Sequence, residues 1–273
     1  MLPPGDLRRA ARVFCSAEKI CIITAWTKRF FGFSELLQEG TRRMRYSAVV
    51  FDLDGTLLDT LADIADAANR VLVKHGLAAH ELDSYRQFVG EGVRVLFERS
   101  LPREACTSER VTACADDFRQ AYAECWNIRT HPYDGVEELL SALVDRNVRL
   151  AVLSNKPDNF TKACVREYFP KFSFEAVLGQ RDGVPRKPDP AGALEIAAIM
   201  DLAPDQFLYV GDTAVDMQTA LAAEMFPVGV LWGFRPLTEL HAGGARAVIE
   251  HPAELLRWFA PGNFGASSTT DTA

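Results

Sequence analysis

Short apolar runs alternate with helical patterns along the chain from Ser47 to about residue 260. The runs are β-branched or aromatic and nearly continuous, which is typical of parallel strands covered on both faces. Strands are expected at 47–52, 148–153, 174–178, 206–211, 226–231 and 246–249. Helices are expected between them, at 135–146, 158–168, 190–201, 214–223 and 252–260. This alternation predicts an α/β fold around a parallel sheet.

The stretch 61–130 departs from this pattern. Amphipathic helices follow one another without a strand, at 61–75, 84–99 and 107–126. Ligand sites in open α/β sheets lie outside the carboxyl ends of the strands, where this insert leaves the first strand. We therefore expect a helical cap over the site at 61–130, and a core made of 45–60 and 131–262.

The two ends of the chain differ from the rest. Residues 1–44 show no sustained alternation, and Met44 stands directly before the first strand. One hypothesis is that Met44 is the natural start and that 1–43 comes from an over-extended reading frame. The other is a genuine N-terminal extension that docks on the body or on a partner. The Ser/Thr-rich tail at 263–273 is expected to be disordered.

Composition excludes several classes of partner. The net charge of −7 over 273 residues offers no basic footprint for nucleic acid. No apolar run reaches the ~20 residues that span a bilayer, so no membrane partner is expected. The six cysteines form no CxxC pair, which favours reduced thiols in a cytoplasmic protein. The sequence leaves open whether the protein is a monomer or a homodimer.

Candidate chemistry begins where the first strand ends. Asp52 and Asp54 place two carboxylates two residues apart, and Gly55 follows them. An ordinary strand-end turn also contains Asp and Gly, so this segment alone does not indicate a function.

Three further segments change that reading. Ser154 and Asn155 follow the second predicted core strand, Lys187 precedes a helix, and Asp212 and Asp216 follow the strand at 206–211. Each segment alone is an ordinary cap, turn or surface lysine. Together they describe a phosphoryl-transfer site, because neighbouring parallel strands bring their carboxyl ends to one edge.

The clustered carboxylates indicate a cation. Hard oxygen ligands suit Mg²⁺, which takes few protein carboxylates and keeps several waters. Asp52 and Asp212 could share one ion, with Asp216 as a further ligand or as a support for one. Without a cation, so many like charges would repel one another.

This order of motifs resembles the haloacid dehalogenase-like superfamily over residues 46–260. The resemblance implies a Rossmann-like core with an inserted cap, and an enzyme that cleaves a small phosphorylated metabolite. By this resemblance Asp52 is the nucleophile that forms a phospho-aspartate, and Asp54 is the general acid and base. The implied phosphoryl-binding groups are Ser154, the Asn155 backbone and Lys187. The implied Mg²⁺ ligands are Asp212, the Asp52 carboxylate and the Asp54 backbone carbonyl.

Single positions separate branches of the superfamily. Asp54 favours phosphate chemistry over dehalogenation. Leu53 stands where cation-pumping ATPases carry lysine, and Ile64 stands where sugar phosphomutases carry histidine. Hydrolysis is therefore the favoured reaction.

Within the phosphatases, four segments resemble phosphoglycolate phosphatases: 52–57, 88–92, 131–136 and 229–235. The expected reaction is hydrolysis of 2-phosphoglycolate to glycolate and phosphate. Nucleoside monophosphates, sugar phosphates and pyrophosphate remain alternatives, as does a non-catalytic binding scaffold. A compact basic pocket would favour phosphoglycolate, whereas a roomy apolar pocket would favour sugars or nucleotides. Arg94 is either a contact for a substrate carboxylate or an exposed surface arginine.

Overall fold

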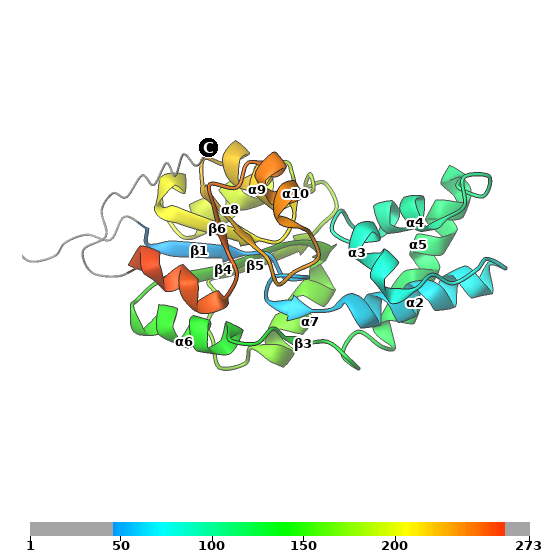
Figure 1. Ribbon diagram of the computed structural model, residues 1–273, viewed down its shortest axis with the longest axis horizontal. Coiled ribbons are helices and arrows are strands. Elements are labelled where there is room, and N and C mark those ends of the chain that lie inside the picture. The colour runs from blue at the N-terminus through cyan, green and yellow to red at the C-terminus, as the bar shows by residue number, and fades with distance from the viewer. Residues whose placement is uncertain (1–45, 260–273) are drawn as a thin grey trace, which may run out of the picture. The chain divides into compact units, whose positions relative to one another are not determined.

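The computed structural model describes residues 46–259 (Figure 1). The predictions for the N-terminal extension and for the tail at 263–273 lie outside these residues. Within them, no helix is both long enough and apolar enough to cross a membrane.

A six-stranded parallel sheet forms the centre of the described chain (Figure 1). Its order is β5-β4-β1-β6-β7-β8. The strands are β1 (Ala48–Phe51), β4 (Arg149–Pro157), β5 (Ala176–Gln180), β6 (Phe207–Gly211), β7 (Phe226–Val230) and β8 (Ala247–Ile249). Every strand predicted from the sequence is present, and the parallel α/β fold is confirmed.

Strand β4 is longer than predicted. It continues to Pro157, which pairs with Gln180 of β5 after a shift in register. Because of this extension, Ser154, Asn155 and Lys156 lie within a buried strand rather than in a loop.

Helices cover both faces of the sheet. Figure 1 shows α6 (Val136–Asp145) and α7 (Asp158–Tyr168) on one face, and α8 (Ala191–Ile199), α9 (Ala214–Ala222) and α10 (Leu237–Gly243) on the other. Alternate residues of β1 enter two separate apolar clusters, Val49 and Phe51 in one and Ala48 and Val50 in the other. Helix α10 was not predicted, and the helix expected at 252–260 is a 3₁₀ helix, η3 (Pro252–Phe259).

The helical cap consists of α2 (Leu61–Lys74), η1 (Leu82–Ser84), α3 (Tyr85–Phe88), α4 (Val93–Ser100) and α5 (Ser108–Ala123). It has an apolar cluster of its own, which includes Leu72, Phe97 and Phe118. The helix expected at 84–99 is broken, because Gly90 and Gly92 have φ values of 123° and 88°.

The chain crosses between core and cap at a short antiparallel pair, β2 (Leu58–Asp59) and β3 (His131–Pro132). Next to it, the buried Asp63 carboxylate accepts hydrogen bonds from the amides of Arg129 and Thr130 and from the Thr130 hydroxyl. These bonds join the outgoing and returning segments of the chain. The exact cap boundaries at 61 and 130 stay a prediction.

Candidate active site

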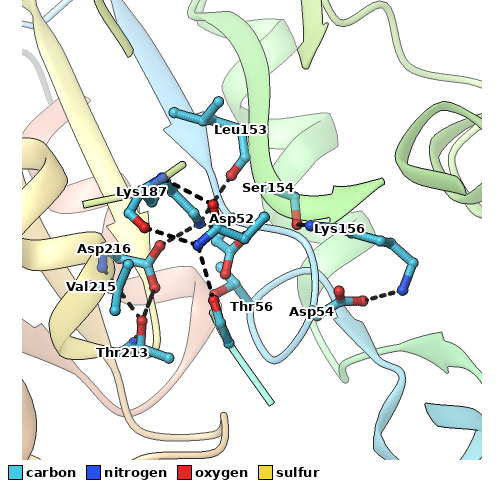
Figure 2. A network of polar contacts seen from close by, with 12 residues as sticks. Asp52, Asp54, Thr56, Leu153, Ser154, Lys156, Lys187, Thr213, Val215 and Asp216 are labelled. Carbon is cyan, nitrogen blue, oxygen red and sulfur yellow. Dashed lines mark hydrogen bonds and ion pairs between the residues drawn. The ribbon is translucent and has the colours of Figure 1, made fainter. Parts of the chain in front are cut away.

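The carboxyl ends of three neighbouring strands bring the candidate residues together (Figure 2). The central strand β1 pairs with β4 on one side and with β6 on the other. Asp52 follows β1, Ser154 lies on β4, and Asp212 follows β6. The sheet therefore gathers residues that are far apart in the sequence.

Lys187 lies between two carboxylates in the buried centre of the site (Figure 2). Its Nζ is 2.9 Å from Asp52 Oδ1 and 2.6 Å from Asp216 Oδ1. It also donates to the Leu153 carbonyl oxygen at 3.2 Å. Burial alone would lower the pKa of Lys187, but the charges of Asp216 and Asp52 raise it well above its usual value. The lysine is thus a fixed cation beside the Asp52 carboxylate.

Both carboxylate oxygens of Asp216 accept hydrogen bonds from the protein. Its Oδ2 accepts hydrogen bonds from the Thr213 amide (3.1 Å) and hydroxyl (2.7 Å), which cap helix α9. Its Oδ1 accepts from Lys187. Asp216 therefore supports Lys187, and because its Oδ1 accepts only one hydrogen bond it also remains in the carboxylate set that could hold a metal.

Asp212 is held from two sides. Its Oδ2 accepts a hydrogen bond from the Phe234 amide at 2.8 Å, and its Oδ1 accepts from the Thr56 hydroxyl at 3.3 Å. Two glycines leave room for it: a Cβ at Gly55 would lie 2.4 Å from Asp212 Oδ2, and one at Gly233 would lie 2.3 Å from Asp212 Cβ. Such spacing excludes any side chain at these positions without a shift.

The carboxylates form a set that fits a hard cation. One oxygen from each of Asp52, Asp212 and Asp216 lies within 4.8 Å of the others, and all three residues are buried. Burial and the neighbouring carboxylates raise the pKa of Asp52 to about 7 and that of Asp212 well above its usual value. The contact of the buried Asp52 Oδ1 with Lys187 Nζ is an ion pair at 2.9 Å. A divalent ion would satisfy this buried negative charge.

Asp54 is paired with a lysine that the sequence prediction left without a role. Lys156 Nζ lies 2.9 Å from Asp54 Oδ1 (Figure 2) and 4.7 Å from the centre of the Tyr122 ring on α5. Burial would lower the pKa of Lys156, but Asp54 raises it above its usual value. The only sequence signal was its position two residues after Ser154, which is also common for surface lysines.

Ser154 and Asn155 differ in what they contact. Ser154 lines the pocket beside Asp52, where its Oγ accepts a 3.3 Å hydrogen bond from the Lys156 amide. The Asn155 side chain instead exchanges hydrogen bonds with the Lys187 backbone (3.0 and 3.2 Å) and donates to Gly90 O of the cap (3.2 Å). Asn155 therefore connects Lys187 to the cap, and its predicted phosphate contact through the backbone stays a prediction.

A pocket opens between these residues and the cap. Its cap side is mainly apolar, and Phe160 and Pro157 continue the apolar surface on the core side. The cap residues that line it are Ile64, Val89, Gly90, Gly92, Val93, Leu96, Phe118, Arg119 and Tyr122. Arg94 is outside this lining and pairs with Glu98 at 2.9 Å, as expected for a surface arginine.

The parallel sheet and the strand-end carboxylates define a class, that of α/β proteins with a helical cap above a buried acidic site. A family model described as haloacid dehalogenase-like hydrolase matches residues 49–230. The chain belongs to this family.

Curated relatives and solved structures agree with this assignment. The chain is 32% identical over 229 residues to a phosphoglycolate phosphatase of Pseudomonas putida, a match that covers 82% of each chain. It is also 32% identical over 192 residues to a phosphoglycolate phosphatase of Psychrobacter arcticus, covering 68% of this chain and 84% of the relative. A predicted phosphoglycolate phosphatase from Haemophilus somnus is similar in structure, with a TM-score of 0.72 and 26% identity over 78% of this chain and 97% of the other. The predicted superfamily and the enzyme class are confirmed.

Proposed function

We infer that the protein is a Mg²⁺-dependent phosphatase that cleaves small phosphate monoesters through a phospho-aspartate on Asp52. The observation that carries this inference is the buried Asp52 carboxylate, held 2.9 Å from Lys187 at the end of the central strand. A carboxylate nucleophile splits hydrolysis into two easier displacements.

The chain's own residues supply positioning and charge. Asp52 attacks phosphorus, while Lys187 and Ser154 bind the phosphoryl oxygens. Lys187 thereby offsets the charge repulsion that would slow the attack. Asp212, the Asp52 carboxylate and the Asp54 backbone carbonyl would hold Mg²⁺, which when bound neutralises phosphate charge.

Asp54 serves as the general acid and base. It gives a proton to the leaving alcohol and later takes one from the water that attacks the phospho-aspartate. Such proton transfer contributes roughly 10²–10⁴-fold in rate. Lys156 holds this carboxylate at the pocket wall, 2.9 Å away, when no substrate is bound.

The specific reaction we propose is hydrolysis of 2-phosphoglycolate to glycolate and phosphate in the cytoplasm. It is supported by the names of the curated relatives. Other phosphate monoesters are the alternative, because the pocket that would select the leaving group is not basic throughout. No nucleic-acid or membrane partner is part of this proposal, and a monomer or a homodimer would serve it equally.

Hydrolysis of a generic aryl phosphate tests the function. We expect turnover that requires Mg²⁺, stops with EDTA, and falls about 10⁴-fold or more in Asp52→Asn. Asp145→Asn, an exposed aspartate at the end of α6, is the matched control and should keep full activity. Activity that persists in Asp52→Asn would exclude the proposed nucleophile. A folded wild-type protein without activity on any ester would favour a binding scaffold.

A further inference from the structure

The Lys156 side chain lies in the pocket beside the proposed general acid, and the proposed mechanism gives it no contact with the substrate. Strand β4 carries Lys156 to the pocket wall, where its Nζ is 2.9 Å from Asp54 Oδ1. Only 4% of the lysine side chain is exposed. A buried ammonium ion attracts a nearby anion more strongly than an exposed one does, because little water screens its charge.

The ammonium group of Lys156 has hydrogen-bonding capacity left. A protonated lysine carries three N–H donors. Among the described residues, this one donates to the Asp54 carboxylate and interacts with Tyr122, whose ring centre is 4.7 Å from Nζ. At least one N–H group therefore stays available to a ligand that enters the pocket.

The proposed reaction also changes the charge beside Lys156. While Asp54 holds the proton that it gives to the leaving alcohol, it does not neutralise the lysine. A buried cation without a counter-charge is costly, so a negatively charged group on the substrate would be stabilised at this point. An uncharged group of the same size would supply no such compensation.

The position of Lys156 limits where that group can lie on the substrate. A general acid lies about 3 Å from the oxygen that it protonates, which places the Lys156 ammonium group on the order of 6 Å from the leaving oxygen. A carboxylate attached one carbon from that oxygen is within reach of Nζ. A longer chain would carry the carboxylate toward the apolar side chains of Leu96 and Phe118 on the cap.

We propose that Lys156 binds a carboxylate on the leaving group, and that the enzyme therefore prefers esters with a second anionic group one carbon from the ester oxygen. The inference rests on the proposed phosphatase function and deepens it, since 2-phosphoglycolate has this arrangement. Arg119 is the other cation among the described residues that line the pocket. Its side chain is 61% exposed, so water screens its charge and its contribution is smaller.

Two esters of nearly equal size test the preference. 2-Phosphoglycolate and its amide, 2-amino-2-oxoethyl phosphate, differ in charge at the group that Lys156 would contact. We expect the kcat/KM of the wild type to be about tenfold higher for phosphoglycolate. Equal values, or a higher value for the amide, would overturn the proposal while leaving the phosphatase function intact. Failure to hydrolyse either ester or an aryl phosphate would remove the proposed function, and this inference with it.

Lysine variants locate the preference. In Lys156→Met both kcat/KM values should fall, because Asp54 loses its partner, but the ratio of phosphoglycolate to amide should itself fall about tenfold. A purely structural role for Lys156 would lower both values equally, and an unchanged ratio would contradict the proposal. Lys162→Met removes a half-exposed lysine of α7 outside the pocket and is the matched control, which should keep the wild-type ratio.

Arg119→Gln separates the two cations of the pocket. Because Arg119 is exposed, this variant should change the ratio by less than about twofold. A tenfold fall of the ratio in Arg119→Gln would assign the carboxylate contact to the cap and overturn the proposal. If Lys156→Met does not fold, Lys156→Gln, which also removes the charge, takes its place with the same expected fall in the ratio.

Discussion

The two sides of the pocket are built from opposite kinds of surface. On the sheet side, carboxylates, Lys187 and hydroxyl groups are buried together and linked by ion pairs and hydrogen bonds. On the cap side, apolar side chains dominate the lining of the pocket. The difference agrees with the proposal that the sheet side carries out the chemistry and the cap side contacts the leaving group.

Removal of the buried Lys187 on the sheet side of the pocket should have the largest effect on stability. Lys187→Met would leave Asp52 and Asp216 buried without a counter-charge, and we expect the free energy of unfolding to fall by about 3–5 kcal/mol. Urea unfolding measures this change. Lys74→Met, which removes a lysine 63% exposed in its pair with Asp117, is the control and should leave stability nearly unchanged. Equal losses of stability in Lys187→Met and Lys74→Met would mean that burial does not make the Lys187 ion pairs more important than the exposed Lys74 pair.

The pH dependence of stability should also come from the sheet side of the pocket, through the Asp52 carboxylate. The folded pKa of Asp52, about 7, lies above its ordinary value of 3.8, so the folded state binds the proton more tightly. The contribution of Asp52 to stability is therefore fully present below pH 3.8 and is lost as pH rises toward 7.

Asp52→Asn tests this sign in metal-free protein. The variant cannot lose this contribution, so its free energy of unfolding relative to that of the wild type should rise between pH 5 and pH 8, by an amount of the order of 3 kcal/mol. Added Mg²⁺ should reduce the difference, because a cation favours the ionised carboxylate of the wild type. A difference that is constant with pH would show that Asp52 is ionised throughout this range.

Alanine substitution of Gly55 tests how closely the chain packs around Asp212 on the sheet side of the pocket. Gly55 and Gly76 have φ values of 86° and 73°, but a Cβ would clash with Asp212 only at Gly55, since Gly76 has nothing within 4 Å. Both alanine variants should lose about 1–2 kcal/mol from backbone strain. Only Gly55→Ala should also lower kcat/KM, about 100-fold, because it displaces Asp212. Similar activity in the two variants would contradict this account of Asp212.

The smallest effect is expected on the cap side. Tyr85 and Tyr122 are both buried, but only the Tyr85 hydroxyl has an acceptor, Asn69 Oδ1 at 2.7 Å. Tyr85→Phe should lower the free energy of unfolding by about 1 kcal/mol, whereas Tyr122→Phe should leave it unchanged or raise it slightly. Chemical denaturation of the ligand-free protein compares them. A clear loss in Tyr122→Phe would reveal an acceptor for its hydroxyl.

Much of the fold could be predicted from local patterns. All six core strands were found, because buried parallel strands leave continuous apolar runs. Strands β2 and β3 were missed, since two residues each are too short for any periodicity. The single helix expected at 84–99 was wrong, because Gly90 and Gly92 take positive φ values between α3 and α4.

The candidate site was only partly predictable. Asp52, Asp54, Ser154, Lys187 and Asp212 were named from motifs. The strand ends and the segment that carries Lys187 bring them to one edge of the sheet. Sequence reasoning missed the pairing of Lys156 with Asp54 and the place of Tyr122 above it, because no local pattern records which cap residue meets which core residue.

The sequence by itself determined the order of strands and helices, the superfamily and the acidic residues at the strand ends. These features depend on local periodicity and short motifs, which a single chain carries openly. Only the tertiary structure decided that Asp216 supports Lys187, that Asn155 joins the lysine to the cap, and that the pocket is mainly apolar. Each of these depends on contacts between segments far apart in the chain, where distance and burial set the outcome.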